Sequence, residues 1–378
     1  MLYLVAPANV YTGGPTAIYQ LCHSLRTLFG YPAVMALEGV KDGIDPVHPN
    51  YKKFECPWIP LSRVEDRVGN TIIIPESLPH LILRFPKSRK VIYWLSVDHF
   101  ILSWLSDRHS HHLIYGLFNS IEYCLKSIKY CLKNVKLGLY RPIHYATDIA
   151  RFVSTKGMNK FLEGNKSFLE HVDLHFAQSV YSMNFLLQAG VDKNKILILR
   201  EPLEDHFLNY NQLNLESKTD LITVNSRKAF SITYQIISKI KKYDKKNVKV
   251  VPLQNVGREK MFELLSRSKV FIDIGFHPGR DRPPREAGVL GNIVVINRSG
   301  GCYYYEDCPV PDKYAITCND VTCRDIDPAR LAQLIIDYVN NYDDYINDFK
   351  NFIELIRKEP DIYMKDLEVI TQRLINET

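Results

Sequence analysis

Residues 275–287 read GFHPGRDRPPREA, a stretch that combines prolines and glycines with closely spaced charged side chains. It follows a continuous apolar run, Val270 to Ile274, that predicts a buried strand, and it leads into a predicted helix. Arginine side chains bind phosphate oxygens through two parallel hydrogen bonds, and prolines restrict the backbone that presents them. Because the free N–H groups of the helix would also attract an anion, the stretch predicts a phosphate-binding loop. A salt-bridged turn between strand and helix is the alternative.

The rest of the chain places this loop in an α/β fold. Apolar runs alternate with helical patterns in the second half, and these runs are residues 221–224, 248–251, 270–274 and 293–296. The first half opens in the same way, with a strand from Leu2 to Val5, a glycine turn, an amphipathic helix and a second strand. Such alternation predicts doubly wound parallel sheets, whose ligands bind beyond the carboxyl ends of the strands.

The length of the chain predicts more than one domain. A chain of 378 residues is longer than one compact core of ordinary size. Periodicity disappears from Arg200 to Lys218, where turn-forming residues accumulate. We therefore predict a Rossmann-like domain at residues 1–202, a second one at residues 203–345, and C-terminal helices at residues 346–378 that pack back on the first domain.

Composition and charge argue against several other classes of protein. The chain has 46% hydrophobic and 24% charged residues and no low-complexity tract, which is typical of a folded globular protein. Its net charge of +6 is spread among acidic residues, so we predict no nucleic-acid partner. The eight cysteines show no CxxC pair and no zinc-like spacing, which favours reduced structural thiols in a cytoplasmic protein. We expect neither a signal peptide nor a membrane span.

The end of the segment at residues 275–287 resembles a known family. Pro283-Pro284-Arg285-Glu286-Ala287, followed by a glycine and the strand from Ile293, is similar to the donor-binding segment of GT-B glycosyltransferases of the GT4 type. The resemblance implies two Rossmann-like domains that face a central cleft, with the acceptor on residues 1–202 and the nucleotide-sugar donor on residues 203–345. Glu286 would correspond to the second acidic residue of the family's E-x7-E motif, which binds the donor ribose.

One position departs from that motif. The first acidic residue of E-x7-E falls at Pro278 in this sequence. Contact with the donor sugar would then come from His277, Arg280 or Asp281. We predict His277 and Asp281 as catalytic residues on this side of the cleft.

The resemblance also implies the remaining ligands of the donor. GT4-like enzymes carry basic residues after the first strand of the second domain, where they neutralise the diphosphate; an ordinary basic segment is the alternative. The loop after the next strand would contact the nucleobase. The predicted donor ligands on this domain are Arg227, Lys228, Asn255, Gly279, Arg280, Arg282, Glu286, Gly300 and Gly301. The acidic pair that follows, Glu306 and Asp307, is expected to be solvated.

Two loops of the first domain would complete the cleft. Gly13 and Gly14 resemble the glycine loop at which GT-B enzymes let a substrate approach the backbone, with a structural turn as the alternative. Asp98 and His99 follow another predicted strand. Asp98 is the predicted general base if the reaction inverts the anomeric carbon, and either residue would hold sugar hydroxyls if it retains configuration. A cap or turn role is the alternative, and Glu76 is a weaker candidate of the same kind.

Residues 115–139 predict a basic amphipathic helix. Apolar residues recur on one face, and lysines recur at three- and four-residue spacing on another, at Lys126, Lys129, Lys133 and Lys136. Such a helix can lie on an anionic membrane, which would place the protein at the inner face of the cytoplasmic membrane, beside a lipid-linked acceptor. A helix packed on the core with a solvated lysine face gives the same pattern.

The resemblance implies a retaining, metal-independent glycosyltransferase that moves a sugar from a nucleoside diphosphate sugar to a hydroxyl of a glycan or glycolipid. We expect a role in the biosynthesis of a surface polysaccharide such as capsule or lipopolysaccharide, and no cofactor besides the donor. A nucleotide-sugar 2-epimerase of GT-B fold and a non-catalytic carbohydrate-binding or scaffold protein are the alternatives. The donor base, the sugar and the oligomeric state stay open.

Overall fold

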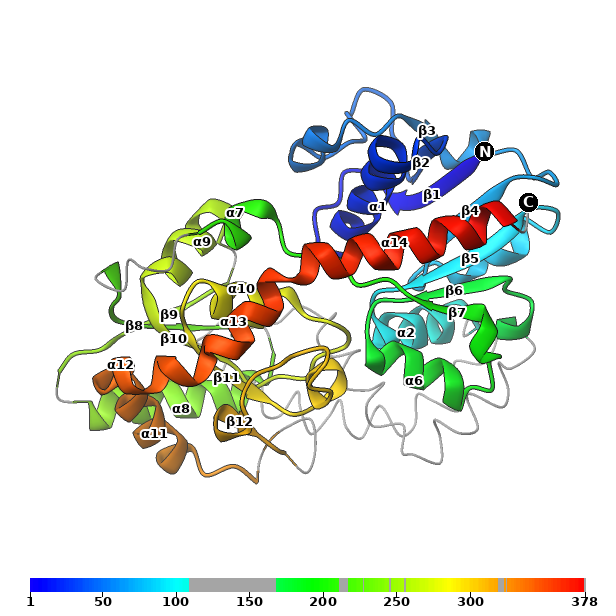
Figure 1. Cartoon of the computed structure of the whole chain (residues 1–378). Helices are drawn as coiled ribbons and strands as arrows, with labels where there is room; N and C mark the ends of the chain where they lie inside the picture. The colour runs from blue at the N-terminus through cyan, green and yellow to red at the C-terminus, as the bar shows by residue number, and fades with distance from the viewer. Residues whose placement is uncertain are drawn as a thin grey trace.

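The computed structural model describes residues 1–108, 168–210, 217–226, 228–244, 246–254, 256–318, 323 and 325–376. The chain forms two halves, each built on its own parallel sheet (Figure 1). The predicted doubly wound α/β fold is confirmed. The predicted helix at 115–139 and the predicted donor ligands Arg227 and Asn255 lie outside the described residues.

The first sheet has the strand order β3-β2-β1-β4-β5-β6-β7, and all neighbouring strands are parallel. The chain winds outward in one direction from β1 and in the other from β4, so the order reverses between these two strands. The carboxyl ends of β1 and β4 therefore form the switch point at which α/β sheets bind ligands. The strands are β1 (Leu2–Pro7), β2 (Ala33–Glu38), β3 (Trp58–Pro60), β4 (Thr71–Pro75), β5 (Arg89–Trp94), β6 (Leu174–Ala177) and β7 (Ile196–Ile198).

Helices cover both faces of this sheet. Alternate residues of each strand point to opposite sides, and both sets are apolar, so both faces are buried. On one face Ile72 and Trp94 pack against α2 (Val97–Arg108) and α6 (Val180–Gln188). On the other face Ile73 and Tyr93 pack against α1 (Gly13–Phe29) and the C-terminal helix α14 (Glu359–Asn376). The short 3₁₀ turns of this half are η1 (Pro49–Phe54), η2 (Leu61–Arg63), η3 (Pro79–Arg84) and η5 (Lys193–Lys195).

The second sheet has the order β12-β11-β10-β8-β9, again parallel throughout. Its switch point lies between β8 (Thr219–Val224) and β10 (Ser268–Asp273). The loops that follow these two strands are residues 225–229 and 274–281. Residues 275–287 therefore begin at this switch point. The other strands are β9 (Lys249–Pro252), β11 (Ile293–Asn297) and β12 (Ala315–Ile316).

The helices of the second half complete its core. Helix α8 packs on α11, and α10 packs on α9 and α13. Their bounds are α7 (Asp205–Leu208), α8 (Phe230–Tyr243), α9 (Arg258–Arg267), α10 (Arg282–Val289), α11 (Pro328–Asn340), α12 (Tyr342–Tyr345) and α13 (Lys350–Arg357), with 3₁₀ turns η7 (Gly300–Tyr303), η8 (Asp312–Tyr314) and η9 (Ile346–Phe349). None of the helices in the described ranges is both long and apolar enough to cross a membrane.

The C-terminal helix α14 returns from the second half to the first, where it contacts α1 and β7 (Figure 1, red). Its Leu367 and Ile370 belong to the hydrophobic cluster of the first sheet. Asp366 on the same helix accepts two hydrogen bonds from the guanidinium of Arg200, from Nε at 3.0 Å and Nη2 at 2.8 Å. The residues at which the predicted domains begin and end stay a prediction.

The structure corrects the expectation that every cysteine is a reduced thiol. Cys318 and Cys323 form a disulfide, with their Cα atoms 4.9 Å apart. Their five-residue separation matches neither a CxxC pair nor a zinc site, so the sequence carried no signal for this pair. Cys22, Cys56, Cys302 and Cys308 are free thiols.

Candidate functional site

The stretch at residues 275–287 lies against the first half of the chain. The backbone N–H of Val97, at the start of α2, donates to the carbonyl of Pro278 at 3.1 Å. The guanidinium of Arg282 donates through Nη2 to Oε1 of Gln20 on α1 at 2.8 Å. A Cβ added to Gly13 would lie 3.8 Å from Cδ of Arg282. The loops at the switch points of the two sheets therefore contact each other, and we call this contact between the two halves the seam.

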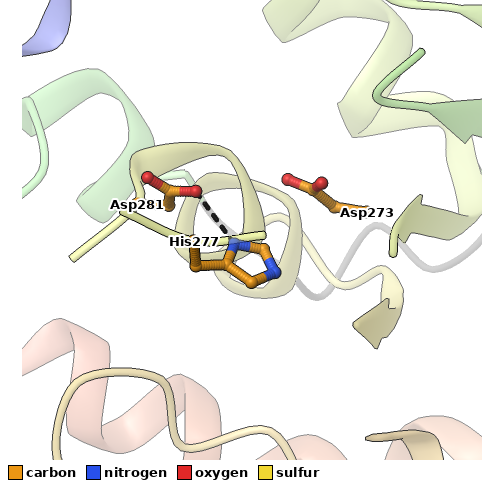
Figure 2. A group of neighbouring side chains, drawn as sticks. All are labelled: Asp273, His277 and Asp281. Atoms are coloured by element: carbon orange, nitrogen blue, oxygen red, sulfur yellow. Dashed lines mark hydrogen bonds and ion pairs between the residues drawn. The ribbon is translucent and has the colours of Figure 1, made fainter. Parts of the chain in front are cut away.

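Four charged and ionisable side chains meet at the carboxyl ends of β8 and β10. Asp273 ends β10, and His277 and Asp281 come from the loop after it (Figure 2). Nδ1 of His277 is 2.8 Å from Oδ2 of Asp281. Lys228, which follows β8, donates from Nζ to Asp281 and lies 3.9 Å from Oδ2 of Asp273. The predicted residues Lys228, His277 and Asp281 are thus brought together, although 53 positions separate the lysine from Asp281.

The hydrogen bond to Asp281 fixes the proton on the His277 ring. A carboxylate accepts and does not donate, so Nδ1 of the imidazole carries the hydrogen. Nε2 of a neutral ring is then an acceptor. Nε2 of His277 is buried and has no hydrogen-bond partner among the described residues.

Electrostatics keep the lysine and the aspartate of this centre ionised. Burial alone would lower the pKa of Lys228, but the carboxylates of Asp273 and Asp281 raise it to about 12. Burial would raise the pKa of Asp281, but Lys228 and His277 hold it well below its usual range. The side chains of Lys228 and Asp281 stay 22% and 17% exposed, whereas Asp273 and His277 are fully buried. The centre therefore presents a permanent ammonium group at its accessible side.

The same side chains have the composition of a metal site. One ligand atom each of Asp273, His277 and Asp281 lies within 4.8 Å of the others. The ammonium of Lys228, however, pairs with both carboxylates, so a side chain already supplies the cation that they require. The absence of a metal requirement stays a prediction.

Glu286 and Arg258 form a second charged pair beside this centre. Glu286 is fully buried on α10, and its Oε1 lies 2.8 Å from Nη1 of Arg258, the first residue of α9. Arg258 also pairs with Glu204 at 3.0 Å and lies over the ring of Phe207, 4.9 Å from the centroid. Sequence reasoning missed Arg258. Its position at the start of the helix after β9, on the carboxyl side of the sheet, was the signal that could have found it.

The structure differs from one detail predicted for residues 275–287 and limits another. Arg280 is 6% exposed and binds Oε1 of Glu359 at 2.6 Å and the carbonyl of Glu201 at 3.1 Å, so we no longer count it as a diphosphate ligand. Helix α10 begins at Arg282, so Pro283 and Pro284 fill its next two positions. Prolines have no N–H, and the expected attraction of an anion to the N–H groups of this helix is therefore largely lost.

The predicted glycines allow close packing of backbone. A Cβ on Gly279 would lie 2.4 Å from the carbonyl oxygen of Leu95, and one on Gly301 would lie 2.0 Å from the carbonyl oxygen of Gly279. Gly300 has a φ of +54°, in the left-handed region, and a Cβ there would lie 1.9 Å from the carbonyl oxygen of His277. These positions have no room for a side chain, because segments of backbone approach closely there. Contact between these glycines and a donor phosphate stays a prediction.

Asp307 is buried rather than solvated, which corrects the expectation for the acidic pair. Its carboxylate accepts hydrogen bonds from the backbone N–H groups of Val180 at 2.8 Å and Tyr181 at 3.0 Å. These groups belong to the first turn of α6, so an aspartate of the second half caps a helix of the first. The capping bond is a further link between the two halves.

The predicted residues of the first half lie across the seam from this centre. Asp98 is buried in the first turn of α2, and His99 beside it is exposed. The first turn of α2 lies against residues 275–287 through the hydrogen bond from Val97 to Pro278, while the catalytic roles of Asp98 and His99 stay predictions.

Glu76 follows β4 at the switch point of the first sheet and is protonated at neutral pH. Burial raises the pKa of its carboxyl to about 8, although the backbone N–H of Leu95 donates to it at 2.9 Å and acts in the opposite direction. A carboxyl that holds its proton at neutral pH does not serve there as a general base.

Glu76→Gln is therefore expected to change how stability depends on pH. The folded protein keeps the Glu76 proton in a range where the unfolded chain has lost it, so wild-type stability falls as the pH rises from about 5 to about 8. Glutamine keeps the shape and does not titrate. The variant should gain on the order of 3 kcal/mol in free energy of unfolding relative to wild type over this range. Urea titrations at both pH values measure the gain, and an equal difference at both would contradict it.

Comparison with known proteins identifies the architecture. No protein-family model matches the chain, and no curated protein sequence is detectably similar. Among solved structures, sucrose-phosphate synthase from Thermosynechococcus elongatus matches with a TM-score of 0.62 at 12% identity, covering 100% of this chain and 99% of that one. Anabaena Alr3699/HepE in complex with UDP-glucose matches with 0.54 at 10%, covering 98% and 99%. Trehalose-6-phosphate synthase matches with 0.51 at 9%, covering 99% of both chains. These likenesses show that the chain has the GT-B fold.

Proposed function

We propose that this protein is a glycosyltransferase that uses a nucleoside diphosphate sugar. The observation that carries the proposal is the centre of Lys228, Asp281 and His277 at the switch point of the second sheet. Arg282, the residue after Asp281, lies against Gly13 of the first half. In this arrangement the donor diphosphate binds Lys228 and Arg282, with Arg227 as a further ligand, and the donor ribose binds Glu286.

The charges of the centre suit departure of a nucleoside diphosphate. Negative charge grows on the diphosphate as the bond to the sugar breaks, and a preorganised cation stabilises that charge. Lys228 is held charged by two carboxylates, so it keeps its proton in the site. His277 and Asp281 face the sugar, and Asp98 and His99 face the acceptor from the other half.

The solved structures suggest which donor to test first. Anabaena Alr3699/HepE was solved with UDP-glucose and also with UDP and glucose. Because this chain shares the fold of that protein, UDP-sugars are the first donors to test, ahead of sugars linked to other nucleotides.

The finer assignments belong to the same proposal. We propose a GT4-type reaction that retains anomeric configuration and needs no metal, with a glycan or lipid-linked glycan acceptor in surface-polysaccharide biosynthesis. The protein would act in the cytoplasm or at the inner face of the cytoplasmic membrane. Lys228 supports metal independence, because it occupies the cationic place between two carboxylates.

A donor-hydrolysis screen with two variants tests this proposal. Purified protein is incubated with UDP-, GDP-, CMP- and dTDP-sugars, and release of the nucleotide is followed. Arg282→Ala and Glu286→Gln should each lower kcat/KM by about 10- to 100-fold, since each removes one charged contact to the donor. The control Arg267→Ala removes an exposed arginine of α9 and should leave kcat/KM unchanged. Equal turnover in all three variants and wild type would show that the donor binds elsewhere.

A further inference from the structure

Four charged side chains are buried together where the two halves, the linker and the C-terminal helix meet. Arg285 is fully buried, Glu201 is 1% exposed, Glu359 is 2% exposed and Arg280 is 6% exposed. Glu201 lies in the linker after β7, Glu359 is the first residue of α14, and both arginines lie in residues 275–287. Side chains of this kind are almost never buried unless they are paired.

The pairing in this cluster is nearly complete. Arg285 binds Oε1 of Glu201 through Nη2 at 2.8 Å and Oε2 of Glu359 through Nη1 at 2.7 Å. Arg280 binds the other oxygen of Glu359 through Nη2 at 2.6 Å. Gln178, which follows β6, donates to Oε2 of Glu201 at 2.7 Å. Each carboxylate therefore accepts at both oxygens, and Nε of Arg282 lies a further 3.7 Å from Oε1 of Glu201.

The cluster also holds the backbone of the loop that carries the donor centre. Nη2 of Arg285 donates to the carbonyl of Arg280 at 3.2 Å, and Nε donates to the carbonyl of Asp281 at 3.3 Å. The side chain of Asp281 is the one that binds both Lys228 and His277. A continuous chain of contacts thus runs from Glu359, through Arg285, to the backbone of Asp281 and its carboxylate.

We propose that Glu359 and Glu201 are positioning residues of the donor site. They fix Arg285 and Arg280, and these arginines hold residues 280–281 where Asp281 can orient His277 and Lys228. The C-terminal helix is accordingly part of the active-site support as well as a strap across the first sheet. The effect on turnover rests on the function proposed above, whereas the effect on the loop does not.

The chain offers a matched control for this proposal. Asp366 lies on the same helix as Glu359 and also ties it to the linker, through its bidentate pair with Arg200. Among the described residues, no hydrogen bond or ion pair joins Asp366 to residues 275–287. Glu359→Gln and Asp366→Asn each neutralise one carboxylate of α14, but the first alone removes an anion that binds Arg280 and Arg285.

Hydrogen–deuterium exchange by mass spectrometry on the full chain gives the first readout. Glu359→Gln should speed amide exchange in the peptide covering residues 275–289 by about tenfold, because the loop opens more often when its arginines lack a partner. Asp366→Asn should leave exchange in that peptide at the wild-type rate. Glu359→Asp keeps the charge and should recover part of the slow exchange. If Glu359→Gln does not fold, Glu201→Gln is read in the same way.

Donor hydrolysis gives the second readout. Glu359→Gln should lower kcat by about tenfold with a smaller change in KM, because a misplaced loop costs more in the transition state than in the bound donor. Equal exchange in the 275–289 peptide of Glu359→Gln and Asp366→Asn would overturn the positioning role. If wild type turned over no nucleotide sugar while the exchange pattern held, the proposed function would fail and the positioning role would stand.

Discussion

Replacing Lys228 with methionine is expected to lower turnover of the nucleotide sugar by ~10²–10³-fold, the loss typical when one preorganised charge is removed from a transition state. Methionine keeps the length and apolar stem of the side chain but carries no charge. The variant also leaves Asp273 and Asp281 facing each other without a cation, so the pKa of Asp281 should rise. The measurement is kcat for donor hydrolysis, with thermal unfolding as a check that the protein stays folded.

A second lysine provides the control for this substitution. Lys269 lies on β10, near the opposite end of the strand from Asp273, and pairs with Asp220 at 2.6 Å. Lys269→Met should change kcat by less than about twofold, because a partly exposed ion pair away from the seam does not touch the donor. Turnover in Lys228→Met that matched this control would show that the ammonium of Lys228 plays no part in the reaction.

Replacing Arg285 with methionine is expected to lower the free energy of unfolding by ~3–5 kcal/mol, because it strands buried carboxylates without a partner. Arg285 is fully buried and binds Glu201 at 2.8 Å and Glu359 at 2.7 Å. A urea titration at neutral pH measures the loss. Adding Glu359→Gln to Arg285→Met should cost less than the sum of the two single changes, because the second change neutralises one stranded carboxylate.

An exposed arginine separates this effect from a general loss of charge. Arg267 on α9 lies 3.9 Å from Glu263, and both side chains are about half exposed. Arg267→Met should cost less than about 0.5 kcal/mol, as is usual for a solvated pair within one helix. A loss of stability in Arg285→Met as small as that in Arg267→Met would contradict the account of the buried cluster.

Much of the fold could be predicted because the strands are continuous apolar runs. The run predicted from Val270 to Ile274 is β10 (Ser268–Asp273), and the run at residues 293–296 is β11 (Ile293–Asn297). Strands buried on both faces read as unbroken apolar segments, and turn-forming residues mark their ends. The disulfide of Cys318 with Cys323 could not be predicted, because a separation of five residues matches no familiar cysteine motif.

The candidate site could be predicted in part for the same reason. Lys228, His277 and Asp281 follow β8 and β10, and adjacent parallel strands bring their carboxyl ends together. Sequence alone could not tell which arginines of residues 275–287 are free to bind a phosphate and which are buried in ion pairs. Arg280 was grouped with Arg282 as a phosphate ligand, but its partner Glu359 lies 79 positions further along the chain, in a helix that returns across the seam.

Calorimetric titration of the wild-type protein with UDP, GDP, CMP and dTDP tests the central claim most directly. The account predicts that at least one of these nucleotides binds, and that Glu286→Gln weakens that binding by about tenfold or more, the loss expected when a buried charged contact to the ribose is removed. Arg267→Ala should bind as wild type does. Failure of all four nucleotides to bind would contradict the claim that the switch point of the second sheet is a nucleotide-sugar site.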